Sequence, residues 1–221
     1  MIKRIFISKN SDDCEPLVHF CNQNKLDLKA QSLIEFEAIP FKIESNFDIV
    51  FFSSIRSAQF YFEKAAKKST IIYACIGETT HSKLKKLGID CEFVGKEAGN
   101  PQKTAEEFKN WVKNRIVFFP QSNLSLGTFS AIFPENQVIK QVVYKTNLIE
   151  RKIEKCQIYI FTSPSNLDAF LTINEISENS KVIVWGKSTS EFAENKGIKS
   201  DLVLKNASIS ELLISIRKMI S

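Results

Sequence analysis

Short apolar runs alternate with amphipathic stretches along the whole 221-residue chain. Runs such as Ile49–Phe52 and Ile158–Phe161 have the length of strands, and their continuous apolar character is typical of strands buried on both faces. Helix-length patterns separate most of these runs, which is typical of parallel sheets covered by helices on both sides. The pattern therefore predicts an α/β fold. The expected strands are Arg4–Ile7, Leu28–Phe36, Ile49–Phe52, Ile71–Ile76, Cys91–Val94, Ile116–Phe119, Val138–Val143, Ile158–Phe161, Val182–Trp185 and Leu202–Leu204, and the expected helices include Ser57–Lys67, His81–Leu87, Thr104–Val112 and Leu167–Ile176.

One segment of the chain occurs twice in different letters. The stretch IGETTHSKLKKLGI (Ile76–Ile89) is matched by WGKSTSEFAENKGI (Trp185–Ile198), and in both a strand end passes through Gly into an amphipathic run that closes on Gly-Ile. Gly186 follows Gly77 by 109 positions (186 − 77), and no gap interrupts this register. A long repeat that occurs only twice predicts two similar lobes instead of a solenoid. The same offset relates Ser54 to Ser163, Thr80 to Thr189 and Gly88 to Gly197.

A second repeat leaves the domain boundaries open. The stretch RIFISKN near the start resembles RIVFFPQSN (Arg115–Asn123), and each leads through a helix-like segment into a long strand. Downstream of the main repeat, Thr104–Val112 matches Ser208–Ile216 with a gap of a few residues. The chain thus alternates two kinds of unit, and two lobes can form from consecutive pairs or with one lobe nested inside the other. Composition does not choose between these arrangements.

Size, composition and charge narrow the class of protein. Hydrophobic residues make up 43% of the chain and charged residues 25%, as in ordinary globular proteins, and the length suits two domains. No run approaches the roughly 20 apolar residues that span a membrane, so we expect a cytoplasmic protein. The net charge of +5 is spread over the outer faces of predicted helices, unlike the clustered basic stripe of nucleic-acid-binding proteins. A diffuse positive field would still attract a polyanionic small molecule.

The residues that commonly bind metals are few and scattered. His19 and His81 are the two histidines, which speaks against a histidine-based metal centre or a catalytic triad, and we expect both to be structural or surface residues. The cysteines are odd in number and never form a CxxC pair, so neither a metal site nor a disulfide framework is predicted. They are Cys14, Cys21, Cys75, Cys91 and Cys156.

Six stretches, taken in order, resemble the uroporphyrinogen-III synthase family over essentially the whole chain. They are FFSSIRSAQF, IGETTHSKLKKLGI, RIVFFPQSN, VVYKT, FTSPSNLDAF and WGKSTSEFAENKGI. The resemblance implies two similar parallel-sheet lobes of the flavodoxin-like type, with one lobe inserted in the other. The first lobe would comprise residues 1–36 and 148–221, the inserted lobe residues 41–142, and two hinge strands residues 36–41 and 142–147.

The resemblance also implies an activity. Members of the family cyclise the linear tetrapyrrole hydroxymethylbilane: its hydroxyl leaves as water, the last pyrrole ring is inverted through a spiro intermediate, and the macrocycle closes in a cleft between the lobes. This implies no metal and no organic cofactor. The expected partner is a small-molecule substrate, without nucleic acid or membrane, and we expect a monomer. Two alternatives stay open: a non-catalytic two-lobed module for an anionic metabolite or nucleotide, although GxGxxG and P-loop motifs are missing, and a structural or regulatory protein that has lost activity.

The duplicated hydroxyl residues are candidates for substrate binding. Ser54 and Ser163 follow apolar strands and open helices, while Thr80 and Thr189 follow a glycine at the next strand-to-helix turn. In a parallel sheet these turns lie at the carboxyl ends of the strands, where ligands bind, and helix N-termini offer unpaired N–H groups to carboxylates. Serine and threonine are also common N-caps there, each worth about 1 kcal/mol to the helix. The two roles are compatible.

Tyr144, in the VVYKT stretch, is the candidate for chemistry. It matches a tyrosine of the family, and a phenol with an ordinary pKa near 10 is protonated at neutral pH and can serve the departing hydroxyl as a general acid. An ordinary strand tyrosine is the competing interpretation. Lys181 matches a family lysine and is expected to pair with a substrate carboxylate, unless it is a solvated lysine at a strand start. Ser122 and Ser165 are expected at the rim of the cleft, and the sequence leaves open whether Lys9 replaces an arginine of many relatives.

Overall fold

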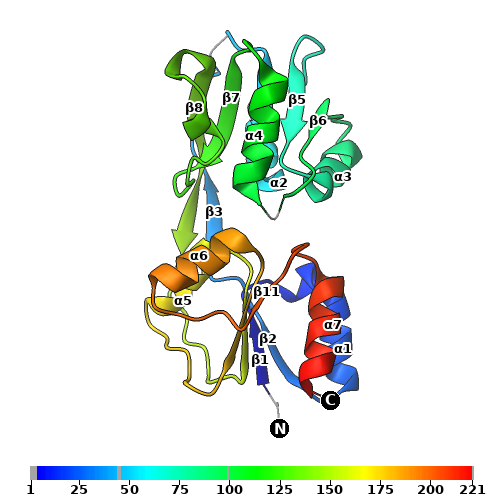
Figure 1. The fold of residues 1–221 in the computed structure, drawn as a ribbon, viewed down its shortest axis with the longest axis vertical. Helices are drawn as coiled ribbons and strands as arrows, with labels where there is room; N and C mark the ends of the chain where they lie inside the picture. The colour runs from blue at the N-terminus through cyan, green and yellow to red at the C-terminus, as the bar shows by residue number, and fades with distance from the viewer. Residues whose placement is uncertain (1–3, 44–45, 99, 221) are drawn as a thin grey trace. The chain divides into compact units, whose positions relative to one another are not determined.

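The computed structural model divides the chain into two compact units (Figure 1). The discontinuous unit contains Met1–Glu35 and Asn147–Ser221, and the inserted unit contains Phe36–Thr146. Each unit has its own sheet, wholly or mostly parallel, with helices on both faces, which confirms the predicted fold class. The structure describes residues 4–43, 46–98 and 100–220.

The discontinuous unit is built on a five-stranded parallel sheet. Its strands are β1 (Arg4–Ile7), β2 (Asp27–Ala30), β9 (Ile158–Phe161), β10 (Lys181–Val184) and β11 (Leu202–Val203). They lie in the order β11-β10-β9-β1-β2, and every pairing is parallel. The order reverses between β1 and β9, as in flavodoxin-like doubly wound sheets, which bind ligands outside the carboxyl ends of the strands at this switch point.

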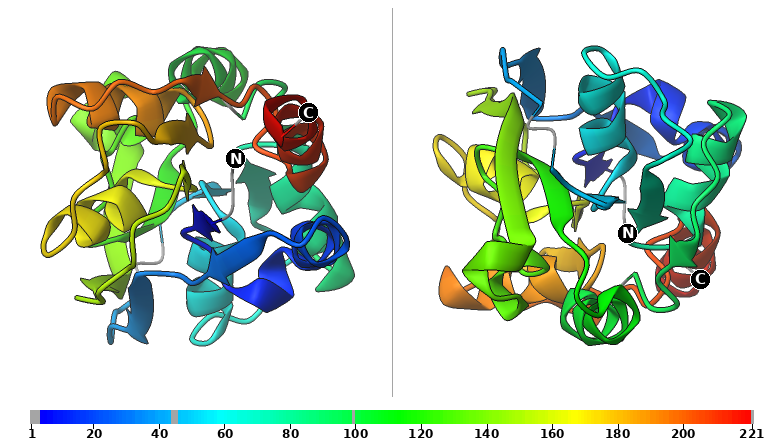
Figure 2. Two further views of the ribbon diagram at one scale, coloured as in Figure 1. Left: turned by 90° about the horizontal axis from the view of Figure 1, so that it is seen from below. Right: turned by 90° about the horizontal axis from the view of Figure 1, so that it is seen from above.

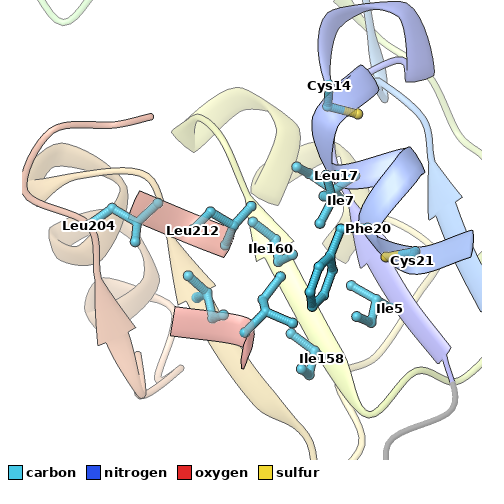
Figure 3. Packing of buried hydrophobic residues seen from close by; sticks show 12 residues of the cluster. Ile5, Ile7, Cys14, Leu17, Phe20, Cys21, Ile158, Ile160, Leu204 and Leu212 are labelled. Carbon is cyan, nitrogen blue, oxygen red and sulfur yellow. The ribbon is translucent and has the colours of Figure 1, made fainter. Parts of the chain in front are cut away.

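Helices cover both faces of this sheet because successive strand residues point to opposite sides. One face is covered by α1 (Glu15–Gln23) and α7 (Ile209–Ile220), the other by α5 (Pro164–Leu171) and α6 (Lys187–Asn195); both pairs can be followed in Figure 2. Phe20 of α1 projects onto Ile5 and Ile160 of the sheet (Figure 3). A short 3-10 turn, η1 (Ser11–Asp13), precedes α1.

The inserted unit repeats this architecture. Its strands are β3 (Ile34–Ala38), β4 (Ile49–Phe52), β5 (Ile72–Cys75), β6 (Phe93–Val94), β7 (Val117–Ser122) and β8 (Val138–Leu148). The sheet order is β3-β8-β7-β4-β5-β6, so β7 and β8 take the places that β1 and β2 hold in the discontinuous unit. The switch point therefore lies between β7 and β4. The helices are α2 (Ile55–Phe62), α3 (Glu78–Lys86) and α4 (Pro101–Val112), with 3-10 turns η2 (Ser130–Ile132) and η3 (Glu135–Gln137).

Aromatic side chains fill the core of the inserted unit. Phe51 lies with its ring centroid 4.4 Å from those of both Phe108 and Phe129, so α4 and the η2 segment share one face of the sheet. On this side Gly95 is required by a close approach: a Cβ there would lie 2.2 Å from the carbonyl oxygen of Ile76. The opposite face packs against α2 and α3.

Two local predictions are wrong. The expected single strand Leu28–Phe36 is split into β2 and β3, because the intervening backbone turns aside to meet side chains: the N–H of Ser32 donates to Asn10 Oδ1 at 3.0 Å and that of Leu33 to Asn166 Oδ1 at 2.8 Å. The helix-like segment expected after Arg115–Asn123 consists of the 3-10 turns η2 and η3.

β3 and β8 are neighbours at the edge of the second sheet, and both cross the boundary between the units. The N–H of Ile39 donates to the carbonyl of Val143 at 3.1 Å, and that of Ile149 donates to Leu33 at 2.8 Å. Residue numbers thus rise along one strand while they fall along the other, so this pairing is antiparallel.

Candidate active site

The serines of the repeat cap two helices with the same geometry. Ser54 has φ −161° and ψ 159°, and its Oγ accepts a hydrogen bond from the N–H of Ser57 at 3.1 Å at the start of α2. Ser163 has φ −161° and ψ 158°, and its Oγ accepts from the N–H of Asn166 at 3.2 Å at the start of α5. Each serine follows the strand next to a switch point, β4 or β9, at its carboxyl end. Both caps therefore lie where doubly wound sheets bind ligands.

A β-bulge brings Tyr144 to the switch point of the inserted unit. Along β7 and β8, Gln121 pairs with Val142, but the next residue, Ser122, pairs with Tyr144, so one residue of β8 is skipped. Bulges re-aim side chains and are common next to active sites. Tyr144 is 8% exposed at this position.

The surroundings of Tyr144 keep its phenol protonated. Burial raises the pKa of Tyr144 above its ordinary value, while hydrogen bonding with Ser54, the charge of Arg56 and hydrogen bonding with Ser122 oppose this rise. Because the net direction is upward from about 10, the phenol holds its proton throughout the neutral range. Ser54 already accepts from a backbone N–H, so its own hydroxyl proton is free for an acceptor such as the phenol oxygen.

Ser122 belongs to a hydrogen-bonded loop anchored on β8. Its Oγ lies 3.0 Å from Oγ1 of Thr146 and accepts from the N–H of Leu124 at 2.9 Å. Asn123 Oδ1 accepts from the N–H of Thr146 at 2.7 Å, and the N–H of Asn123 donates to the carbonyl of Tyr144 at 3.2 Å. This network holds the Ser122 hydroxyl beside the phenol. Ser122 was expected only at a cleft rim, yet the structure brings it together with Ser54 and Tyr144.

Three further residues surround the ring of Tyr144. Phe60 stacks on it with a centroid separation of 4.9 Å and an interplanar angle of 14°, and Phe36 meets it edge-on at 5.8 Å. The guanidinium carbon of Arg56 lies 4.1 Å from the centroid of Phe36. None of these three residues was predicted as a site residue from the sequence. The signal available was the repeat itself, because Arg56 and Phe60 differ in kind from their counterparts 109 positions later.

The strand-to-helix turn at Ser163 corresponds in the discontinuous unit to the turn at Ser54; we call these two regions the Ser163 corner and the Ser54 corner. The side chains of the Ser163 corner are hydroxyls and one amide. Ser8, 1% exposed at the end of β1, accepts from the N–H of Thr162 at 2.9 Å, which ties the two strands at the switch point. Asn166 is 4% exposed; its Nδ2 donates to Ser163 Oγ at 3.2 Å, and its Oδ1 accepts from the N–H of Leu33. The caps thus match in the two units, but the side chains around them do not.

The remaining hydroxyl candidates contribute mainly through backbone. Thr80 and Thr189 lie in the first turns of α3 and α6 but are only 9% and 3% exposed, so the helix ends offer a ligand their N–H groups more than these side chains. Ser165 lies in the first turn of α5, and Lys9 follows β1 at the carboxyl edge; both are half-buried.

Lys181 is not brought together with the other candidates. It begins β10, so it lies at the amino end of the strand, opposite the edge that carries Ser163. Its Nζ donates to Asp201 Oδ1 at 2.8 Å, and the other oxygen of Asp201 accepts from the N–H of Val182. These residues line a separate cavity of about 510 Å³ at the amino edge of this sheet.

The histidines have no site around them. His81 Nε2 lies 2.9 Å from Asp90 Oδ1, and this hydrogen bond raises the pKa of His81, whereas His19 is exposed on α1. Within residues 4–43, 46–98 and 100–220, no three His, Cys, Asp or Glu side chains cluster as metal ligands would. Over the same residues, no helix is both long and apolar enough to cross a membrane.

Two doubly wound, mostly parallel sheets, each with a serine-capped helix at its switch point, define a two-unit α/β protein whose candidate site residues lie mainly at strand carboxyl ends. Residues 21–214 match the family model described as uroporphyrinogen-III synthase HemD, and the chain belongs to this family. The finding confirms the resemblance of the six stretches. Uroporphyrinogen-III synthases are cyclising lyases of tetrapyrrole biosynthesis.

Individual relatives agree with this assignment. The chain is 24% identical over 232 aligned positions to the uroporphyrinogen-III synthase of Chlorobaculum parvum (strain DSM 263 / NCIMB 8327), covering 91% of this chain and 93% of the relative. The crystal structure of uroporphyrinogen-III synthetase from Helicobacter pylori 26695 has a TM-score of 0.71 at 20% identity, over 99% of this chain and 100% of that one. A mutant uroporphyrinogen III synthase from the extremely thermophilic bacterium Thermus thermophilus reaches 0.70 at 10% identity, over 99% and 98%. At such identities the two structures support the fold alone.

Proposed function

We propose that the chain closes hydroxymethylbilane to uroporphyrinogen III with loss of water, as a cyclising lyase. The family match supports the reaction. The observation that carries its assignment to particular residues is the buried phenol of Tyr144, which lies with the hydroxyls of Ser54 and Ser122 at the switch point of the inserted unit.

Tyr144 acts on the leaving hydroxyl. The phenol donates its proton as the carbon–oxygen bond breaks, and water departs from a resonance-stabilised pyrrolic cation. That carbon then bonds to the substituted carbon of the last pyrrole ring, which gives the spiro intermediate. The older bond of that substituted carbon, to the methylene bridge of the neighbouring ring, then breaks. The bridge carbon bonds to the free α-carbon of the last ring, which inverts this ring, and the proton that the α-carbon loses on rearomatisation restores the phenol. One molecule of substrate therefore gives one macrocycle and one water molecule. Ser54 and Ser122 stabilise the phenol oxygen while it lacks its proton.

The carboxylates of the substrate are held by helix ends and cations. In the inserted unit we assign this role to Arg56, the first turn of α2 and the first turn of α3 with Thr80. In the discontinuous unit we assign it to Ser163 and Ser165 of α5 and to the first turn of α6 with Thr189. Lys181 is left out because it lies at the opposite edge of its sheet and pairs with Asp201.

The protein is proposed to work as a monomer in the cytoplasm on this small molecule, without nucleic acid, membrane or cofactor. β3 and β8, which both pass between the units, are proposed as the hinge strands, at residues 36–41 and 142–147. Analytical ultracentrifugation of the purified chain tests the proposed monomeric state. A single species at the mass of one chain is expected, and a stable dimer would contradict the proposal.

The decisive assay supplies freshly prepared hydroxymethylbilane and separates the uroporphyrinogen isomers. Isomer I forms spontaneously, so a reaction without protein provides the background. The proposal expects isomer III in excess, in proportion to the amount of the chain. Isomer I alone would overturn the enzymatic function, and binding of the substrate without isomer III would indicate a non-catalytic binding protein.

A further inference from the structure

The two copies of the repeated helix differ on the side that reaches Tyr144. Aligned at the offset of 109, Arg56 of α2 corresponds to Ser165 of α5, and Phe60 corresponds to Ala169. Ala169 is fully buried in the core of the discontinuous unit, as is expected of a small residue on the inner face of a helix. Phe60 instead is half-buried and lies against the phenol ring. The inserted copy thus carries a cation and a large ring that the other copy lacks.

Together these residues clamp the ring of Tyr144. The Phe60 ring lies nearly parallel to it at 4.9 Å, and Phe36 of β3 approaches it edge-on at 5.8 Å and 66°. Both arrangements are favourable for aromatic pairs. Arg56 lies on Phe36 at 4.1 Å, a cation–π contact that helps hold that second ring in place. The tyrosine ring is therefore supported from two directions by side chains of α2 and β3.

The clamp has a chemical consequence because the phenol oxygen must meet both serines. Rotation of the tyrosine ring away from Ser54 and Ser122 would break the arrangement on which proton donation depends. Phe60 restricts that rotation and keeps water from one face of the ring.

We propose that Phe60 is a positioning residue for Tyr144, and that Phe36 with Arg56 completes the clamp. This inference rests on the proposed function of Tyr144. Phe60 touches the phenol ring and acts through it: it fixes the orientation of the ring and shields one of its faces from water. Among the groups that face the phenol, Arg56 of α2 carries the charge, while Ser54 of α2's cap and Ser122 of β7 are neutral hydroxyls.

The first test compares Phe60→Ala with Phe62→Ala. Phe62 is on the same helix and is also half-buried, but the aromatic rings that it contacts are those of Phe52, Tyr61 and Tyr73. For F60A we expect kcat to fall roughly tenfold with KM changed less than about threefold, because orientation in the transition state is lost while binding remains. F62A is expected to keep kcat within about twofold. Phe60→Tyr should recover most of the loss, and equal losses in F60A and F62A would overturn the inference.

The second test compares the double variant F60A/Y144F with the single variant Y144F. If Phe60 acts through Tyr144, adding F60A to Y144F changes kcat by less than about twofold, since residues acting as a unit are not additive. A full further tenfold loss would contradict the inference.

The third test needs no activity and so separates the inference from the proposed function. Absorbance titration of the phenols in F60A, minus that of F60A/Y144F, isolates Tyr144, and the same difference is taken for the parent and Y144F. Removal of Phe60 admits water, so the midpoint should move to lower pH. An unchanged midpoint would overturn the inference whatever the assay shows, whereas a moved midpoint without isomer III would overturn the function alone. Circular dichroism checks that each variant is folded, and Phe60→Leu replaces F60A if it is not.

Discussion

The Ser54 corner of the inserted unit and the Ser163 corner of the discontinuous unit have the same backbone geometry but are surrounded by different side chains. Their cap torsions agree within a degree, and both serine oxygens accept from the N–H three residues on. Around Ser54 lie a phenol, two aromatic rings and a guanidinium. Around Ser163 lies the buried amide of Asn166, whose two ends are already hydrogen-bonded.

Arg56 and Phe60 differ within the repeat, but the phenol itself comes from outside it. Tyr144 is carried by β8, an eleven-residue strand with a bulge against β7, whereas β2, which has the same place in the other sheet, has four residues. A duplicated strand–helix unit therefore provides a helix end twice, and the strand beside β7 or β1 decides which copy receives a phenol. We expect the Ser54 corner to govern turnover and the Ser163 corner to govern binding.

The largest expected effect comes from Tyr144→Phe, which removes the acid and leaves the ring in its clamp. Loss of a general acid typically costs 10²–10⁴-fold, so we expect kcat for isomer III to fall about 100-fold or more. Tyr61→Phe is the matched control, because Tyr61 is also buried in the inserted unit and its pKa is raised to about 12 by burial, but it packs in the core beneath α2. If the two variants retain equal turnover, Tyr144 has no catalytic role.

A smaller effect separates the two corners directly. Ser54→Ala and Ser163→Ala each remove an N-cap, so both should lower the free energy of unfolding by about 1 kcal/mol in chemical denaturation. Ser54→Ala also removes a partner of the phenol and should reduce kcat about tenfold, whereas Ser163→Ala should mainly raise KM. Equal kcat values for the two variants would contradict the assignment of turnover to the Ser54 corner and of binding to the Ser163 corner.

Alkaline pH should weaken the inserted unit. The pKa values of Tyr61 and Tyr144 are raised in the folded state, so above about pH 10 the unfolded chain releases protons that the folded chain retains. The stability contributed by these groups is complete below pH 10 and is lost as the pH rises toward the folded values, about 12 for Tyr61. Thermal unfolding followed against pH should show this decline, and the double variant Y61F/Y144F should show a shallower one. An identical decline in the parent and the double variant would assign it to other groups.

Lys181→Ala should have the smallest effect. Its ion pair with Asp201 is largely exposed on the lysine side, and exposed pairs contribute at most about 1 kcal/mol. Because Lys181 lies at the amino edge of its sheet, both kcat and KM should stay within about twofold of the parent. A large rise in KM would return Lys181 to the substrate site and would show that its position at the amino edge is compatible with binding.

Much of the fold was predictable because it depends on local signals. The strands Arg4–Ile7, Ile49–Phe52 and Ile158–Phe161 agree with the structure to the residue, since a run of three or four apolar residues bounded by polar ones is typical of a short buried strand. The prediction failed at Leu28–Phe36, where an apolar pattern continues across a break imposed by distant side chains, Asn10 and Asn166.

The candidate site was predictable in part for the same reason. The repeat pointed to Ser54 and Ser163 as helix starts, and both are. Lys181 was grouped with them although it starts a strand that ends at that edge, and the first and last residues of a four-residue strand lie about 10 Å apart. Phe36, which follows the break in the predicted strand, could not be paired with Tyr144 from periodicity.

The amino-acid sequence by itself determined the strand–helix alternation and the capping serines, because each depends on residues within one or two turns of one another. It also shows the duplication, because the two copies keep one offset of 109 positions. The tertiary structure alone decided that β7 and β8 complete the inserted sheet and that a bulge brings Tyr144 to Ser54. These depend on pairings between segments up to about a hundred residues apart, whose free energy comes from sheet register and burial and leaves no periodic mark along the chain.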